Sequence, residues 1–248
     1  MKRQQLINDW LTGLYPGQIF SLAPASADAS FRRYFRASFA DRTLIVMDAP
    51  PEHENCGPFI HIDRLFAAAG VHVPQIIAQD LDQGFLLLSD LGNTTYMQAL
   101  ADGNIKTARD LYGAATDALI QIQLASQANE LPDYDEAMLL REMRLFPEWY
   151  IGKHLQATLT AEQSAMLEDT FQRIIRNNLA QPRSYVHRDY HSRNLMYIEA
   201  TLSPTSLPGA GESASDSRSE KLLNPGILDF QDAVYGPITY DLASLFKD

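Results

Sequence analysis

One octapeptide is more informative about this chain than any other segment: His187-Arg188-Asp189-Tyr190-His191-Ser192-Arg193-Asn194. Apolar residues precede it at 185–186 and follow it at 195–198, so a polar loop between two short strands is predicted. Phosphoryl transfer from a magnesium nucleotide requires a carboxylate that orients the acceptor hydroxyl and, a few residues away, a neutral oxygen ligand for the metal. Asp189 and Asn194 have these residue types at this spacing.

A second carboxylate must bridge the metal to the nucleotide phosphates, and it should follow another buried strand. Asp229 comes directly after the apolar run 226–228. Each pattern taken singly also occurs in ordinary turns, but their order and the intervening strand signals favour a joint phosphoryl-transfer site. His187 and His191 have a spacing that zinc ligands can use, yet no further His or Cys cluster accompanies them, so zinc is disfavoured.

Composition places the chain among folded proteins outside the disordered and membrane classes. Its 248 residues are enough for one large domain or two lobes, and 46% of them are hydrophobic. The net charge of −11 opposes approach to nucleic acid or to an anionic membrane. A single cysteine, Cys56, excludes an internal disulfide, and no export signal or bilayer-length apolar run is visible, so a cytoplasmic location is expected.

The first 90 residues are predicted to be mostly sheet, with little helix. Apolar spacing indicates helices over 3–15 and 57–69. Paired strands are expected between 31 and 48 and again at 75–80 and 85–89, where Gly84 supplies the turn.

After residue 90 the pattern becomes helical, with stripes over 107–127, 138–150 and 160–179. We therefore predict an α+β fold of two lobes, a small antiparallel-sheet lobe at 1–90 and a larger helical lobe at 91–248. The Ser-, Pro- and Gly-rich segment 203–220 is predicted to be a disordered surface insertion.

The octapeptide, together with Ile227-Leu228-Asp229-Phe230-Gln231 and Gly236-Pro237-Ile238-Thr239-Tyr240-Asp241-Leu242-Ala243, resembles the aminoglycoside/choline phosphotransferase superfamily, whose fold is protein-kinase-like. Three further segments, 30–36, 44–51 and 85–92, are similar to bacterial anomeric sugar kinases. That resemblance implies ATP and Mg²⁺ as cofactors. It also implies a small-molecule amino sugar as acceptor, phosphorylated at the C1 hydroxyl of N-acetylmuramate or N-acetylglucosamine in cell-wall recycling.

The resemblance implies a role for each matching residue. Asp189 would be the catalytic base, His187 would brace its loop, and Asn194 and Asp229 would hold magnesium. The backbone of Leu88, Ser89, Asp90 and Leu91 would meet the adenine, because this segment joins the two lobes. Asp241 would anchor the catalytic loop, although an ordinary helix N-cap explains it equally well.

Two departures from the family pattern leave alternatives open. No glycine-rich phosphate loop is present, and Met47 stands near where the phosphate-pairing lysine is expected. Arg32, Arg33 or Arg36 is therefore a candidate for that cation, against the alternative that these arginines are solvated strand charges. The second departure is at the end of the sequence, which stops just as a helix begins near Tyr240. Family members continue with further helices. The chain is therefore expected to be a fragment that lacks these C-terminal helices.

The rival functions are a choline- or aminoglycoside-type kinase, whose cationic acceptor the net negative charge would attract, and a nucleotide-binding pseudokinase without turnover. The absent lysine and the absent C-terminal helices motivate the second rival. Sequence reasoning leaves the oligomeric state open.

Overall fold

The computed structural model describes residues 2–27, 31–198 and 225–248. The predicted insertion at 203–220 lies outside the described residues. The chain divides into two compact units, one made of residues 1–118 and 192–231 and the other of residues 119–191 and 232–248. This division does not test the predicted boundary between two lobes at residue 90, which stays a prediction.

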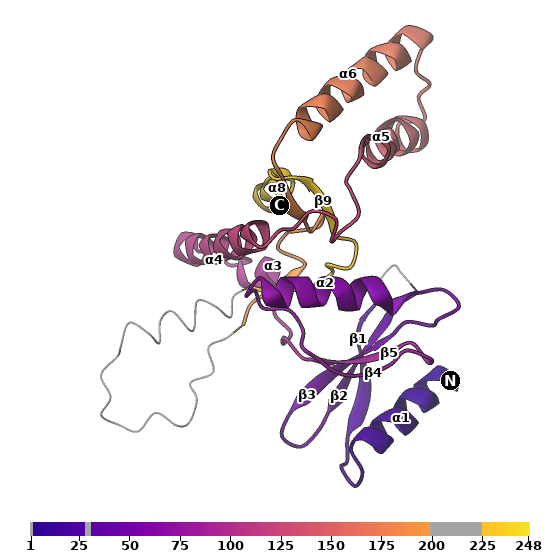
Figure 1. The fold of residues 1–248 in the computed structure, drawn as a ribbon, viewed down its shortest axis with the longest axis vertical. Coiled ribbons are helices and arrows are strands. Elements are labelled where there is room, and N and C mark those ends of the chain that lie inside the picture. The colour runs from indigo at the N-terminus through magenta and orange to yellow at the C-terminus, as the bar shows by residue number, and fades with distance from the viewer. Residues whose placement is uncertain (1, 28–30, 199–224) are drawn as a thin grey trace. The chain divides into compact units, whose positions relative to one another are not determined.

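The first unit is built around an antiparallel sheet of five strands in the order β1-β2-β3-β5-β4. Its strands are β1 (Ser21–Ala27), β2 (Arg33–Ser38), β3 (Thr43–Asp48), β4 (Ile76–Asp80) and β5 (Phe85–Ser89). Helices α1 (Lys2–Leu14), α2 (Cys56–Ala68) and α3 (Tyr96–Ala99) and the short pair β7 (Leu195–Met196) and β8 (Gly226–Ile227) complete it. Figure 1 shows α1 and α2 beside this sheet.

Alternation along the strands divides the sheet into two faces with different partners. On one face Ala37, Val46 and Leu87 pack against Ile7 and Leu11 of α1, and all five side chains are buried. The neighbouring positions of the same strands, among them Tyr34, Ile45 and Leu88, point to the opposite face. A helix with one apolar stripe thus covers one side of the sheet and leaves the other side for a different use.

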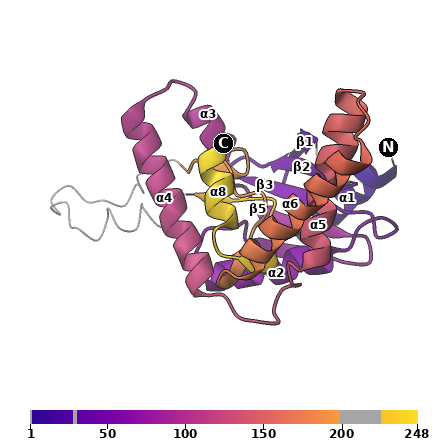
Figure 2. The ribbon, with the colours of Figure 1, turned by 90° about the horizontal axis from the view of Figure 1, so that it is seen from above.

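The second unit is mainly helical. It contains α5 (Glu136–Leu145), the π-helix η1 (Phe146–His154), α6 (Ala161–Leu179), α8 (Tyr240–Lys247) and the strand pair β6 (Arg183–Val186) and β9 (Val234–Pro237). Helix α4 (Ile105–Leu124) runs from the first unit into the second. Figure 2 shows α5 and α6 side by side, and buried Leu139, Ile175 and Val234 form the core between these elements.

Most predicted elements are present, and the differences have physical causes. Strand β1 was not predicted, because Ser21–Ala27 contains Pro24 and small residues; it lies at the edge of the sheet, and its register shifts between Pro24 and Ser26. The predicted helix 138–150 is split between α5 and η1. Among the described helices, none combines the length and apolar character needed to cross a bilayer.

The predicted turn before β5 depends on Gly84, which has a φ of +71°. A Cβ atom at this position would lie 1.9 Å from the carbonyl oxygen of Ala49. That carbonyl belongs to the residue after β3, whose amide donates a hydrogen bond to the Gly84 carbonyl at 2.9 Å. Only glycine therefore fits, in both conformation and space.

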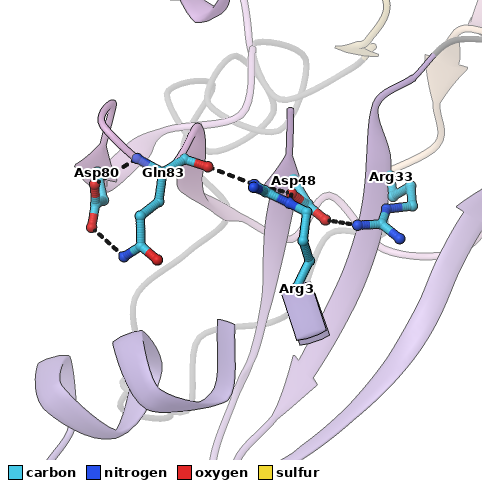
Figure 3. A network of polar contacts seen from close by, with 5 residues as sticks. All are labelled: Arg3, Arg33, Asp48, Asp80 and Gln83. Carbon is cyan, nitrogen blue, oxygen red and sulfur yellow. Dashed lines mark hydrogen bonds and ion pairs between the residues drawn. The ribbon is translucent and has the colours of Figure 1, made fainter. Parts of the chain in front are cut away.

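A charged network fastens α1 to the sheet, as Figure 3 shows. The carboxylate of Asp48, at the end of β3, has no solvent exposure. Arg3 of α1 donates to its Oδ1 at 2.8 Å through Nε, and Arg33, its cross-strand neighbour on β2, pairs with its Oδ2. Arg3 also donates to the carbonyl of Gln83 and lies over the ring of Phe85, 4.9 Å from its centroid.

We predict that Asp48→Asn lowers the free energy of unfolding by about 2–4 kcal/mol, because the buried carboxylate is lost and both Arg3 and Arg33 lose their anionic partner. Urea unfolding followed by far-UV circular dichroism measures the change. Asp41→Asn is the matched control, because the Asp41 side chain is 71% exposed and its ion pair with Arg42 should contribute less than about 0.5 kcal/mol. Equal stability of the parent and Asp48→Asn would contradict the prediction.

Candidate active site

A cavity of about 400 Å³ lies in the first unit, on the side of the sheet opposite α1. Tyr34, Arg36 and Ile45 line it from β2 and β3, and Phe59 lines it from α2. Six of the predicted site residues also line it, namely Leu88, Ser89, Asp90, Leu91, Asn194 and Asp229. The proposed adenine-binding segment and the proposed metal ligands, far apart in sequence, therefore share one cavity. A second cavity, of about 490 Å³ between α2 and β4, contains none of the predicted site residues.

The pairing of β7 with β8 places Asn194 beside Asp229. Leu195 pairs with Ile227, and the amide of Leu228 donates to the carbonyl of Asn194 at 2.9 Å. The Asn194 side-chain amide lies 3.3 Å from Oδ2 of Asp229, while Gln231 donates to Oδ1 at 2.8 Å.

Asp229 has a backbone φ of +61°, in the left-handed region that is costly for residues other than glycine. Such conformations concentrate at functional sites, where the surrounding structure enforces them. The turn that follows β8 therefore aims this carboxylate at the cost of local strain.

Asn194 and Asp229 suit a magnesium ion in type and number. A carboxylate and an amide oxygen are hard ligands, and Mg²⁺ usually takes one or two protein ligands while phosphates and water complete its coordination. Their side chains lie within hydrogen-bond distance of each other, so both can reach one ion. In the described parts of the chain, no group of three or more His, Cys, Asp or Glu side chains is arranged to hold a metal, and this includes His187 and His191.

The segment after β5 is tied to β2 by a two-bond ion pair. Arg36 donates to the Asp90 carboxylate at 2.6 Å through Nε and at 3.0 Å through Nη2, and Nη2 also donates to the carbonyl of Gly92 at 3.0 Å. Burial raises the pKa of Asp90, but hydrogen bonds from Arg36 and Thr43 outweigh it and hold that pKa below its usual value. The ion pair keeps the cavity wall at residues 88–92 attached to the sheet.

Two of the three arginines predicted as candidates for the phosphates, Arg32 and Arg33, do not line the cavity. Arg33 faces α1 and pairs with Asp48, on the opposite side of the sheet from the cavity. Arg32 has its Nε 3.7 Å from a carboxylate oxygen of Glu54. Neither lines the cavity, whereas Arg36 and Arg193 do. The assignment of Arg32 and Arg33 to ATP stays a prediction, without support from this geometry.

The loop that carries His187 and Asp189 belongs to the second unit and follows β6. Asp241, at the start of α8, accepts hydrogen bonds from the backbone amides of His187 at 2.6 Å and Arg188 at 3.0 Å. Arg188 has a φ of +80°, and its guanidinium pairs with Glu142 of α5. Asp241 of α8 and Glu142 of α5 thus hold the backbone just before Asp189 in place.

His187 of this loop and Asp241 of α8 are both buried. The His187 ring meets the Tyr190 ring edge to face, with centroids 5.7 Å apart. Burial raises the pKa of Asp241 to about 7, although the two backbone hydrogen bonds counteract it. Asp241 thus anchors the loop and is not the helix N-cap: the N-cap residue of α8 is Thr239, and Asp241 lies within the first turn of the helix.

Comparison with known proteins identifies the family of this chain. Residues 21–200 match the phosphotransferase enzyme family. The chain belongs to that family. The predicted family resemblance is therefore confirmed, and so is the α+β kinase-like fold.

Relatives of this phosphotransferase carry a more specific name. The N-acetylmuramate/N-acetylglucosamine kinase of Pseudomonas aeruginosa is 47% identical over 256 residues, covering 99% of this chain and 68% of the relative. The kinases of the same name from Pseudomonas putida and Neisseria meningitidis serogroup B are 50% and 42% identical and cover 92% and 100% of this chain. The phosphotransferase spans 60% and 67% of their lengths.

Solved structures share the fold at low sequence identity. A choline/ethanolamine kinase family protein from Mesorhizobium loti has a TM-score of 0.61 and 15% identity, covering 98% of this phosphotransferase and 69% of that chain. The choline kinase LicA from Streptococcus pneumoniae also has a TM-score of 0.61, with 12% identity, and covers 99% and 74%.

We predict that Asp241→Asn flattens the pH dependence of stability. The folded pKa of about 7 lies above the ordinary value of 3.8, so the folded phosphotransferase binds more protons than the unfolded chain between these values. Stability contributed by this group is therefore present at low pH and decreases as pH rises from about 4 to 7.

Urea unfolding of both proteins at pH 5.0 and pH 7.5 tests this. Asp63, whose pKa burial also raises to about 7, titrates in both proteins, so the comparison between them isolates Asp241. A fall in stability with pH that is as steep in Asp241→Asn as in the parent would contradict the prediction.

Proposed function

We propose that this phosphotransferase transfers the terminal phosphoryl group of ATP to the anomeric C1 hydroxyl of N-acetylmuramate or N-acetylglucosamine. The observation that carries the kinase chemistry is the shared cavity of Leu88–Leu91, Asn194 and Asp229, which provides a nucleotide pocket with a metal-binding end. The names of relatives at 42–50% identity support the amino-sugar acceptor. The reaction belongs to cell-wall recycling in the cytoplasm, where ATP is available.

In this proposal the adenine lies along the backbone of residues 88–91, between the apolar side chains of Ile45 and Met196, which also line the cavity. The ion pair of Arg36 with Asp90 holds that backbone in place before the nucleotide arrives. A preformed wall reduces the entropy lost on binding.

Asn194 and Asp229 hold magnesium in this proposal. When bound, the ion would supply positive charge that neutralises the phosphates. Gln231 hydrogen-bonds Oδ1 of Asp229, which leaves the carboxylate oriented by its neighbours as well as by its strained backbone.

Asp189 accepts the proton of the acceptor hydroxyl and aligns its oxygen for attack on the phosphorus. His187 and Asp241 act as positioning residues, because their contacts determine the path of the loop and not the reacting atoms.

A magnesium-ATP screen across N-acetylmuramate, N-acetylglucosamine, choline and aminoglycosides tests the acceptor assignment. The net charge of −11 favours a cationic acceptor as the second candidate, because it attracts cations at long range. Turnover with either sugar and not with choline or aminoglycosides is the expected result. Turnover with only the cationic acceptors overturns the sugar assignment, and ATP binding without any turnover indicates a pseudokinase.

We predict that Asp189→Asn lowers kcat by about 10²- to 10⁴-fold, because the amide keeps the shape of the side chain and cannot accept the proton. ATP affinity, measured by calorimetric titration, should stay within about twofold of the parent. Asp169→Asn on α6, whose side chain is exposed, is the matched control and should keep full turnover. Near-normal kcat in Asp189→Asn would remove this residue from the proposed role.

We predict that Asp229→Ala abolishes the magnesium-dependent part of ATP binding as well as turnover, because the phosphates lose their metal clamp. Titration of ATP with and without magnesium measures that part separately from the adenine contacts. Asp117→Ala, an exposed position on α4, is the control for loss of one negative charge. A variant that binds magnesium-ATP as tightly as the parent, and unfolds at the same urea concentration, would refute the metal assignment.

A further inference from the structure

Arg193 is a cation in the candidate active site that has no ionic partner among the described residues. It lines the cavity next to Asn194, and its side chain is exposed. Within residues 2–27, 31–198 and 225–248, Arg193 forms no ion pair, hydrogen bond or ring contact. Its positive charge is therefore available to a ligand.

Three other arginines, in β2 or just before it, already have acidic partners. Arg36, which also lines the cavity, gives two hydrogen bonds to Asp90 and one to the carbonyl of Gly92. Arg33 pairs with buried Asp48 on the other face of the sheet, and Arg32 lies beside Glu54. Met47, near the expected position of the phosphate-pairing lysine, is buried and uncharged.

The backbone on both sides of Arg193 is anchored. The carbonyl of Ser192 accepts a hydrogen bond from the amide of Met97 at 3.1 Å, and the carbonyl of Asn194 accepts one from Leu228 at 2.9 Å. The backbone amide of Tyr197 donates to the carbonyl of Thr94 at 2.8 Å. A guanidinium that extends from a fixed backbone loses less freedom on binding than one on a loose loop.

We propose that Arg193 binds an anionic oxygen group of the ligand that occupies this cavity. This inference deepens the proposed function and rests on it. Guanidinium groups bind phosphates and carboxylates through paired hydrogen bonds, and such charge-assisted bonds are about twice as strong as neutral ones. Two groups in the proposed reaction have this chemistry: the phosphate chain of ATP and the lactyl carboxylate of N-acetylmuramate, which N-acetylglucosamine lacks.

The test compares the parent with Arg193→Gln, which removes the charge, and Arg193→Lys, which keeps it. Calorimetric titrations with ATP, with adenosine and with inorganic tripolyphosphate report on the phosphate group. The ratio of KM for N-acetylmuramate to KM for N-acetylglucosamine reports on the carboxylate. Arg109→Gln, an exposed α4 position outside the cavity, controls for the loss of one positive charge.

If the phosphates are the partner, Arg193→Gln weakens ATP and tripolyphosphate binding at least tenfold and adenosine binding less than twofold. If the carboxylate is the partner, ATP affinity is unchanged and the KM ratio rises at least tenfold. In either case Arg193→Lys recovers part of the loss and Arg109→Gln causes none.

The inference is overturned if Arg193→Gln changes neither quantity, if it weakens ATP and adenosine equally, or if Arg109→Gln has the same effect. The titrations do not depend on turnover. An Arg193-dependent ATP affinity in a parent that phosphorylates neither sugar would therefore refute the proposed acceptor and support the phosphate contact. Sugar phosphorylation that is insensitive to Arg193 would do the reverse.

Discussion

The loop that carries Asp189 depends on one buried carboxylate. Asp241 is 1% exposed and accepts the backbone amides of His187 and Arg188, whose positions along the chain lie more than fifty residues away. These two amides come just after β6 ends, where strand pairing can no longer satisfy them. An unpaired buried amide costs about 1–3 kcal/mol, so a carboxylate that satisfies two of them limits the loop to few conformations. The energetic cost of burying Asp241 appears as its raised pKa.

In the first unit, too, buried or half-buried carboxylates hold separate elements together. Asp48 joins α1 to the sheet through Arg3 and Arg33, and Asp90 joins the segment after β5 to β2 through Arg36. The sheet separates these two tasks, because Arg33 and Arg36 lie at odd and even positions of one strand and so face opposite sides. Of the cavity-lining arginines, Arg36 pairs with Asp90, whereas Arg193 has no polar partner in the part of the chain that the structure describes.

The sequence predicted much of this architecture. Long stripes and strong turn residues led to α1, α2, α4, α6 and the strands β2 to β5 within a few residues of their observed ends. Strand β1 was missed because its small residues and Pro24 give no apolar alternation, and it forms because β2 offers a free edge for pairing. The short strand β9 was also missed, because its four residues include Gly236 and Pro237 and give no clear strand pattern. It forms through its pairing with β6.

Residue types and local spacing were enough to select Asp189, Asn194 and Asp229 as candidates and to suggest the family. Local sequence also placed residues 88–91 at the end of a buried strand. The sequence could not show which of Arg32, Arg33 and Arg36 faces the cavity, because the face of the sheet on which a strand residue lies is known only once the strand register is known. The tertiary structure decided the faces: the register of β2 with β3 pairs Arg33 with Asp48 on the side of α1 and places Arg36 in the cavity wall. Which arginine meets the phosphates stays a prediction. The neighbours of Asp241 were equally out of reach of the sequence, because two amides and a carboxylate this far apart along the chain meet only when the helix and the loop have packed together.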